Sequence, residues 1–295
     1  YDKKLWTENE EGKLPCIYAL ITIFFWSMAF IFTRMTLPYF SASSLGFLRY
    51  LIASAALIVI VLVTKMKPPQ LKDCPLFLLS GAIGFFLYMI TFNQGLVSVP
   101  AATASVVNAT VPAVTALIAG VVYKEKIRKV QWIAILIELV GVAVLTVMSG
   151  GLSAGKGLLW MFGAALSLST YNILQRKLTQ TYTALQASTF SIFFGTLLLA
   201  IFAPTAMREL AAAPPIQYAY VAFLGIFPSA IAYVSWSVAF AKAERTSQVS
   251  NFMVLVLFFT SILGILILGE ALNPATLCGG GITLAGVLLF NHESQ

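Results

Sequence analysis

Ten long apolar runs, separated by short polar connections, constrain the fold of this chain more than any other feature. They cover residues 14–36, 44–64, 75–97, 101–123, 130–149, 156–177, 183–203, 216–241, 246–268 and 274–291. Each run matches the roughly 20 residues that an α-helix needs to cross a bilayer. Each is also about twice as long as a strand of a membrane β-barrel. We therefore expect an all-α polytopic membrane protein with ten transmembrane helices in the lipid bilayer.

The composition agrees with this interpretation and leaves no room for a separate soluble domain. Of the 295 residues, 59% are hydrophobic and 10% are charged, whereas soluble domains carry about 25% charged residues. The first run is too long for a signal-peptide core and lacks a small-residue cleavage site, so we expect it to be the first helix. Cys16, Cys74 and Cys278 lie far apart without a CxxC pair, which argues against a disulfide framework or a zinc site.

The basic residues of the connections predict the orientation. When both termini and the 2–3, 4–5, 6–7 and 8–9 loops share one side, that side holds fourteen of the 18 lysines and arginines, and the other side holds Arg34, Arg49, Lys156 and Arg208. Cytoplasmic loops carry such an excess. We expect cytoplasmic N- and C-termini in a plasma membrane, the inner membrane of a bacterium. The net charge of +7 then reflects topology and does not indicate a nucleic-acid partner.

An internal repeat divides the chain into two halves, residues 1–150 and 151–295. At an offset of 145 residues, matching positions include Tyr88 and Tyr233, Ser105 and Ser250, Glu125 and Glu270, and Gly141 and Gly286. Because each half contains an odd number of helices, the second half must be inverted relative to the first. Two inverted five-helix repeats are typical of secondary transporters, which bind substrate at the repeat interface near the middle of the membrane.

Several motifs resemble the EamA-type family of the drug/metabolite transporter superfamily. They are Phe25-Trp26-Ser27, Leu48-Arg49-Tyr50-Leu51, the segment from Ala102 to Glu125 with Pro112, Gly141-Val142, and the second-half segments Ser169 to Arg176 and Ser247 to Glu270. The resemblance covers nearly the whole chain. It implies an exporter or facilitator that works by alternating access, with the first four helices of each half around a central cavity and the fifth and tenth helices outside it. Members carry amino acids, aromatic compounds, nucleobase-like metabolites and drugs.

Polar and aromatic side chains within the apolar runs are the candidates for substrate binding, because such groups are costly in hydrocarbon unless they are paired or functional. They are Trp26, Phe30, Tyr88, Phe92, Asn93, Asn108, Tyr171, Asn172, Tyr233, Trp236, Gln248 and Asn251. Packing between helices or anchoring at the membrane interface is the alternative role. An aromatic, amide-rich lining favours a neutral, zwitterionic or amphipathic solute. Arg49, about a turn inside the second helix, is the nearest candidate for an inward basic residue, but we expect it instead to extend to the outer interface or to cap a helix.

Three acids and a proline complete the candidate residues. Glu138 lies near the middle of the fifth helix, where an acid suggests a functional site, here a proton carrier. A bonded or dimer-facing carboxylic acid is the alternative. Glu125 and Glu270 end the fourth and ninth helices on opposite membrane faces, and we expect them to cap neighbouring helix N-termini or to contribute to a gate. Pro112 interrupts the fourth helix and is a candidate hinge.

The sequence lacks the motifs of enzymes. His292 is the only histidine, and there is no Gly-rich phosphate loop, HExxH motif or nucleophile elbow. We expect no catalytic residues, no metal and no cofactor. The main hypothesis is a secondary transporter that exports or equilibrates small metabolites, foremost neutral or zwitterionic amino acids or aromatic amphipathic solutes. A proton or a counter-transported solute is the expected coupling partner, and the assembly is a monomer or a homodimer. A broad drug or cation efflux protein, and a membrane enzyme or receptor without transport, are the alternatives.

Overall fold

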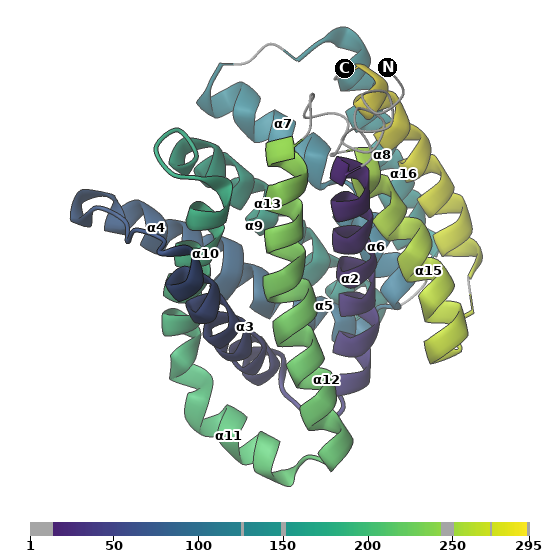
Figure 1. The fold of residues 1–295 in the computed structure, drawn as a ribbon. Coiled ribbons are helices and arrows are strands. Elements are labelled where there is room, and N and C mark those ends of the chain that lie inside the picture. Colours follow the sequence, from purple (N-terminus) through teal and green to yellow (C-terminus); the bar gives the residue numbers. More distant parts are fainter. Residues whose placement is uncertain (1–13, 125–126, 149–151, 243–250, 272, 294–295) are drawn as a thin grey trace, which may run out of the picture.

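All regular elements of the structure are helices (Figure 1). The computed structural model describes residues 14–124, 127–148, 152–242, 251–271 and 273–293. In these ranges eight helices are long and apolar enough to cross a membrane, and two shorter apolar helices, Leu255–Leu268 and Pro274–Phe290, follow them. The expected all-α polytopic fold is confirmed.

Each crossing keeps the position of its apolar run, and several crossings contain more than one helical segment. The first five consist of α2 (Leu14–Thr36), α3 (Ala42–Thr64), η1 (Leu71–Asp73) with α4 (Cys74–Gly81), η2 (Ala82–Leu87) and α5 (Tyr88–Ser98), α6 (Ala101–Asn108) with α7 (Val111–Val122), and α8 (Lys129–Met148). The second five consist of α9 (Leu152–Leu178), α10 (Ala184–Leu199) with η3 (Ala200–Phe202), α12 (Pro215–Ile226) with η4 (Phe227–Ile231) and α13 (Ala232–Lys242), η5 (Asn251–Met253) with α15 (Val254–Leu268), and α16 (Pro274–Glu293).

Local sequence explains several helix boundaries. Thr183 and Gln186 form a reciprocal capping box at the start of α10. Gly269 ends α15 in the left-handed conformation, with φ of 64°, which glycine adopts at little cost. Pro112 lies in the first turn of α7, where its missing N–H removes no helical hydrogen bond. The fourth crossing is therefore divided directly after Asn108, the last residue of α6.

The inverted relation of the two halves is visible in the helix directions (Figure 1). The helix α7, which ends at Val122, finishes at the end of the bundle where α2 begins and α16 ends. Its repeat partner α15, which ends at Leu268, finishes at the opposite end. The described parts of the first and last helices thus meet the same face, as ten crossings require.

Two π-helical turns occupy equivalent places in the halves. The turn η2 interrupts the third crossing from Ala82, and η4 interrupts the eighth from Phe227. The offset, 227 minus 82, equals the 145 residues of the sequence repeat. π-Turns are rare and often lie at functional sites, and both turns here lead directly into the helices that carry Tyr88 and Tyr233.

One helix is absent from the sequence prediction. The helix α11 (Ala203–Ala212) follows η3 and lies across the end of the bundle opposite the described chain ends (Figure 1). Glu209 Oε2 accepts a hydrogen bond of 3.0 Å from the backbone N–H of Ser41, just before α3. Through this hydrogen bond, α11 satisfies a backbone donor at the start of α3. The sequence did not predict α11 because the helix is shorter than a membrane crossing.

The repeat partners α8 and α16 pack directly against each other through small residues. A Cβ atom at Gly279 would lie 2.6 Å from the carbonyl oxygen of Gly141, and one at Gly286 would lie 2.7 Å from Cγ of Glu138. Only glycine allows such close approach, which is typical of helix pairs within membranes. The contact is reciprocal, since Thr283 faces Gly141 as Glu138 faces Gly286. This pair forms a close connection between the two halves.

Candidate functional site

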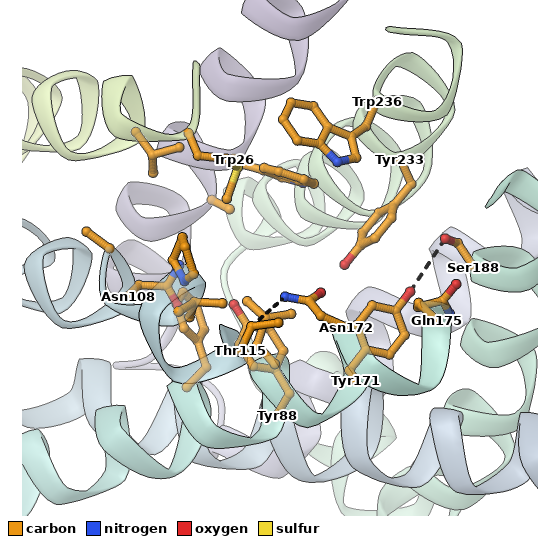
Figure 2. Close-up of a pocket in the computed structure, with 18 of the residues that line it drawn as sticks. Trp26, Tyr88, Asn108, Thr115, Tyr171, Asn172, Gln175, Ser188, Tyr233 and Trp236 are labelled. Atoms are coloured by element: carbon orange, nitrogen blue, oxygen red, sulfur yellow. Dashed lines mark hydrogen bonds between the residues drawn. The ribbon is translucent and has the colours of Figure 1, made fainter. Parts of the chain in front are cut away.

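A central cavity of about 900 Å³ lies between the two halves. Its volume falls in the range of small-molecule sites, roughly 300–1,000 Å³. Side chains from nine of the ten crossings, all except α8, line it. Ten of these side chains are labelled in Figure 2: Trp26, Tyr88, Asn108, Thr115, Tyr171, Asn172, Gln175, Ser188, Tyr233 and Trp236. Both repeats therefore contribute to one site.

A cluster of three aromatic rings forms one wall of the cavity (Figure 2). The ring of Trp26 lies 5.2 Å from that of Trp236 and 5.7 Å from that of Tyr233, centroid to centroid. Trp26 Nε1 donates a hydrogen bond of 3.2 Å to the carbonyl oxygen of Pro228. The π-turn that contains Pro228 thus fixes the indole of the first crossing against the eighth. We refer to Trp26, Tyr233 and Trp236 as the aromatic wall.

A second group of rings comes from the first half. Tyr88 stacks on Phe92 at 5.4 Å, and Phe30 meets Phe92 edge to face at 5.0 Å. Tyr88 and Phe92 are four residues apart and share one face of α5. All three residues line the cavity, which brings together the first-half aromatic residues that the sequence singled out.

Polar side chains lie opposite the aromatic wall. Asn172 Nδ2 donates a hydrogen bond of 3.3 Å to Thr115 Oγ1, and Tyr171 Oη donates one of 3.4 Å to Ser188 Oγ (Figure 2). The amide oxygen of Asn108 is enclosed and accepts no hydrogen bond within the described residues. Buried acceptors of this kind are usually hydrogen-bonded, so Asn108 must turn before this oxygen can meet a donor.

Arg49 lies in the cavity, and the expectation that it reaches the outer interface or caps a helix is wrong. Its side chain is 6% exposed and lines the cavity. Nε donates a hydrogen bond of 2.6 Å to Ser229 Oγ. The reason is the close approach of α3 to the eighth crossing, where a Cβ atom at Gly225 would lie 2.5 Å from Cβ of Ile52. The arginine has no path to the interface and turns inward.

Of the predicted binding residues that the structure describes, Asn93 lies elsewhere. Asn93 is fully buried and does not line the cavity. Its Nδ2 donates a hydrogen bond of 2.8 Å to the carbonyl oxygen of Ala42, which joins α5 to the start of α3. Gln248 and the side chain of Asn251 lie outside the described residues.

Glu138 is buried between α8 and α16 and does not line the cavity. Its side chain is 2% exposed, and Oε2 has no hydrogen-bond partner within the described part of the chain. The position is the repeat equivalent of Thr283, whose hydroxyl donates to the carbonyl oxygen of Gly279. Glu138 therefore lies in the packing contact between α8 and α16 and not along the path of a solute.

Glu270 and Arg34 join the two halves at one end of the cavity. Glu270 Oε1 lies 3.4 Å from Nε of Arg34. Both carboxylate oxygens accept hydrogen bonds, of 3.2 and 3.0 Å, from the backbone N–H of Ala101, so Glu270 caps α6. Arg34 Nη1 donates to the carbonyl oxygens of Leu96 and Val99, at 2.9 and 2.7 Å. We call these contacts the Glu270 network. Its repeat counterpart would involve Glu125, which lies outside the described residues.

At the opposite end, the cavity reaches the surface of the bundle. Its lining there includes Arg176 and Thr179, both exposed, in the last turns of α9 and just after it. These residues belong to the side that carries most of the basic residues. The structure therefore has one closed end, at the Glu270 network, and one open end, at Arg176.

Helical spacing could have identified some lining residues that the sequence analysis left out. Asn108, Pro112 and Thr115 all line the cavity, and their separations of four and three residues place them on one helical face. Tyr171, Asn172 and Gln175 follow the same rule in α9. For Ser188, sequence offers no comparable signal, because serine is common between packed helices.

Two inverted five-helix repeats around a cavity define a membrane transporter. The EamA-like transporter family matches this chain over residues 13–147 and again over residues 155–292. The chain therefore belongs to the EamA-like transporter family of the drug/metabolite transporter superfamily, and it is a transporter and not an enzyme.

Two curated relatives cover nearly the whole chain. A protein of Streptantibioticus cattleyicolor named "Probable terminal-alkyne amino-acid exporter" is 30% identical over 279 residues, which are 94% of each chain. The "Uncharacterized transporter YdfC" of Bacillus subtilis is 32% identical over 268 residues, which are 89% of this chain and 86% of that one. A solved crystal structure with 18% identity and a TM-score of 0.64 covers 96% of this chain and 99% of its own, which shows a shared fold.

Proposed function

We propose that this transporter exports zwitterionic or aromatic amphipathic solutes, foremost amino acids, by alternating access. The observation that carries the proposal is the character of the cavity. An aromatic wall can stack on an apolar or aromatic side chain, while amide and hydroxyl groups opposite it can bind the polar end. The name of the Streptantibioticus cattleyicolor relative, which refers to an amino-acid exporter, supports the same substrate class.

The orientation that the basic residues predict is compatible with export. If the protein lies in the plasma membrane with both termini in the cytoplasm, the open end at Arg176 faces the cytoplasm. Solute enters the cavity from that side. The closed Glu270 network then faces outward. Release requires the closed end to open, driven by a proton gradient or by a counter-transported solute. The five-helix halves, residues 1–150 and 151–295, would move relative to each other in this step.

The alternative of a broad cation-efflux protein finds less support in the cavity. Among the described residues that line it there is no aspartate or glutamate, whereas Arg49 lies within it. A cationic drug would therefore meet a like charge and no counter-charge, which costs free energy in a partly dry site. An aromatic amine without a carboxylate is expected to be a poor substrate.

Transport by the purified protein in proteoliposomes tests the proposal. Vesicles loaded with an unlabelled amino acid should accumulate the labelled form by counterflow, with saturation, for at least one aromatic or aliphatic member of a panel. Trp236→Ala should reduce this uptake because it removes part of the aromatic wall. Trp160→Ala is the matched control, since Trp160 is exposed on the outside of α9 and does not line the cavity. Absence of counterflow across the whole panel would refute the proposal.

A further inference from the structure

Arg49 is a buried cation in the central cavity, and no acidic side chain among the described residues pairs with it. Its side chain is 94% buried, as its exposed fraction of 6% implies. Within the described ranges the one ion pair joins Arg34 to Glu270. A buried charge without a partner is strongly unfavourable. The position therefore favours an anion, which none of the described residues that line the cavity supplies.

The hydrogen bonds of Arg49 leave part of the guanidinium free for a ligand. Nε donates to Ser229 Oγ, and Nη1 lies 4.0 Å from the sulfur of Met89, a weak acceptor. Nη2 has no partner in the described part of the protein. Arginine carries five N–H donors in a planar fork, so the edge formed by Nη1 and Nη2 retains donors that can bind an oxyanion.

The described acids are all engaged or distant from this site. Asp73 accepts a hydrogen bond from Tyr182 Oη at 2.7 Å, and Glu209 accepts one from Ser41. Glu270 pairs with Arg34, and Glu138 lies between α8 and α16. None of these four residues lines the cavity. The aromatic neighbours of Arg49 are the ring of Tyr50, whose centroid lies 5.8 Å from Cζ, and the phenols of Tyr88 and Tyr233, which interact with it electrostatically.

We propose that Arg49 binds the carboxylate of the transported solute in the central cavity. A carboxylate matches the guanidinium edge with two parallel hydrogen bonds. The nearby phenols of Tyr88 and Tyr233 line the cavity and can donate further hydrogen bonds to its oxygens. The substrate class is thus an amino acid with a free carboxylate, its side chain against the aromatic wall. This inference rests on the proposed function and specifies its substrate.

A carboxylate fits this site better than a phosphate ester. A phosphate carries nearly two negative charges and is usually bound by several basic side chains or by helix N-termini. Arg49 is one guanidinium within an otherwise aromatic and amide lining, and the other arginine of the lining, Arg176, lies at the exposed open end. One charge on the protein therefore balances one charge on the ligand.

The first test compares three ligands on the unmodified transporter. A transported amino acid, its methyl ester and its decarboxylated amine compete with the labelled amino acid for binding to purified protein. We expect the acid to bind about 10-fold to 100-fold more tightly than the ester, because the ester loses a charge-assisted pair. Equal binding of acid and ester would overturn the role of Arg49 while leaving transport intact. If no amino acid binds or is transported, the proposed function itself fails.

The second test replaces the charge. Arg49→Gln should remove the preference for acid over ester, whereas Arg49→Lys should keep part of it because the charge remains. Ser229→Ala is the matched control, since it removes the partner of Nε but not the cation, and it should still prefer the acid. Binding of the methyl ester reports whether each variant is folded. A folded Arg49→Gln protein that still prefers the acid would contradict the proposal.

Discussion

Two arginines at equivalent places in the repeats have different surroundings at the two ends of the cavity. Arg34 pairs with Glu270 across the halves, in contact with the capped start of α6. Arg176, 142 residues later in the sequence, lies over the ring of Tyr123, 4.6 Å from its centroid, beside the open mouth. The comparison teaches that closure here depends on a carboxylate that bridges the halves. Both repeats place an arginine at this position, and at the closed end the arginine forms an ion pair with Glu270.

The largest expected effect comes from removing the bridging carboxylate. Glu270→Gln weakens the ion pair with Arg34 and the cap on Ala101, which together stabilise the closed end by about 2 kcal/mol. That figure corresponds to roughly a 30-fold shift toward the outward-open state. A cysteine placed at Ala29, in the cavity of a variant without native cysteines, should react faster with an impermeant maleimide added outside. Arg208→Gln, an exposed change on α11 at the same end, is the control and should not alter the rate.

The equivalent change in the first half should have the opposite sign. Because Glu125 is the repeat partner of Glu270, Glu125→Gln is expected to destabilise the state that is closed at the Arg176 end. Labelling of the same Ala29 cysteine from outside should then become slower, by a factor on the order of 10. An increase in labelling, like that of Glu270→Gln, would show that the two ends are not closed by related interactions.

A third change affects the contact between α8 and α16 that connects the halves. It does not affect either end of the cavity. Gly286→Ala places a Cβ atom 2.8 Å from the carbonyl oxygen of Ala134. We expect a loss of about 2 kcal/mol in unfolding free energy from this overpacking, measured as a lower thermal midpoint in detergent. Gly281→Ala is the control, because a Cβ atom there meets open space. Unchanged stability of Gly286→Ala would mean that α8 and α16 are not closely packed.

The smallest effect is expected at Glu138. Glu138→Gln should raise the unfolding free energy by about 1 kcal/mol, since the neutral amide removes the cost of burying a carboxyl group that can ionise. Counterflow should remain unchanged, because Glu138 does not line the cavity. A loss of coupled transport would instead identify this acid as the proton carrier that its place in the sequence suggests.

The crossings were predictable because their signals are local. A run of apolar residues needs no partner to be recognised, and the repeat identified α8 and α16 as equivalents. The inward face of each helix was harder to predict. Tyr88 and Asn93 lie on one helix at similar depth, yet Tyr88 lines the cavity and Asn93 binds the backbone of α3.

Arg49 shows most clearly what sequence reasoning lacked. Its direction depends on the contact between Ile52 and Gly225, residues that are far apart in the chain. A lone arginine near a helix end is usually expected to reach the interface, and no local pattern opposes that expectation. Likewise, α11 is too short to be predicted from an apolar run, although it caps α3 through Glu209.

The two π-turns determine the direction in which the tyrosine side chains that follow them point. A residue added to a helical turn rotates every later side chain by about 100° about the helix axis. The directions of Tyr88 and Tyr233 are therefore set by η2 and η4. If either π-turn moved along its helix past its tyrosine, that phenol would rotate away from the cavity while the helix stayed intact. The position of each π-turn therefore determines whether its tyrosine faces the cavity.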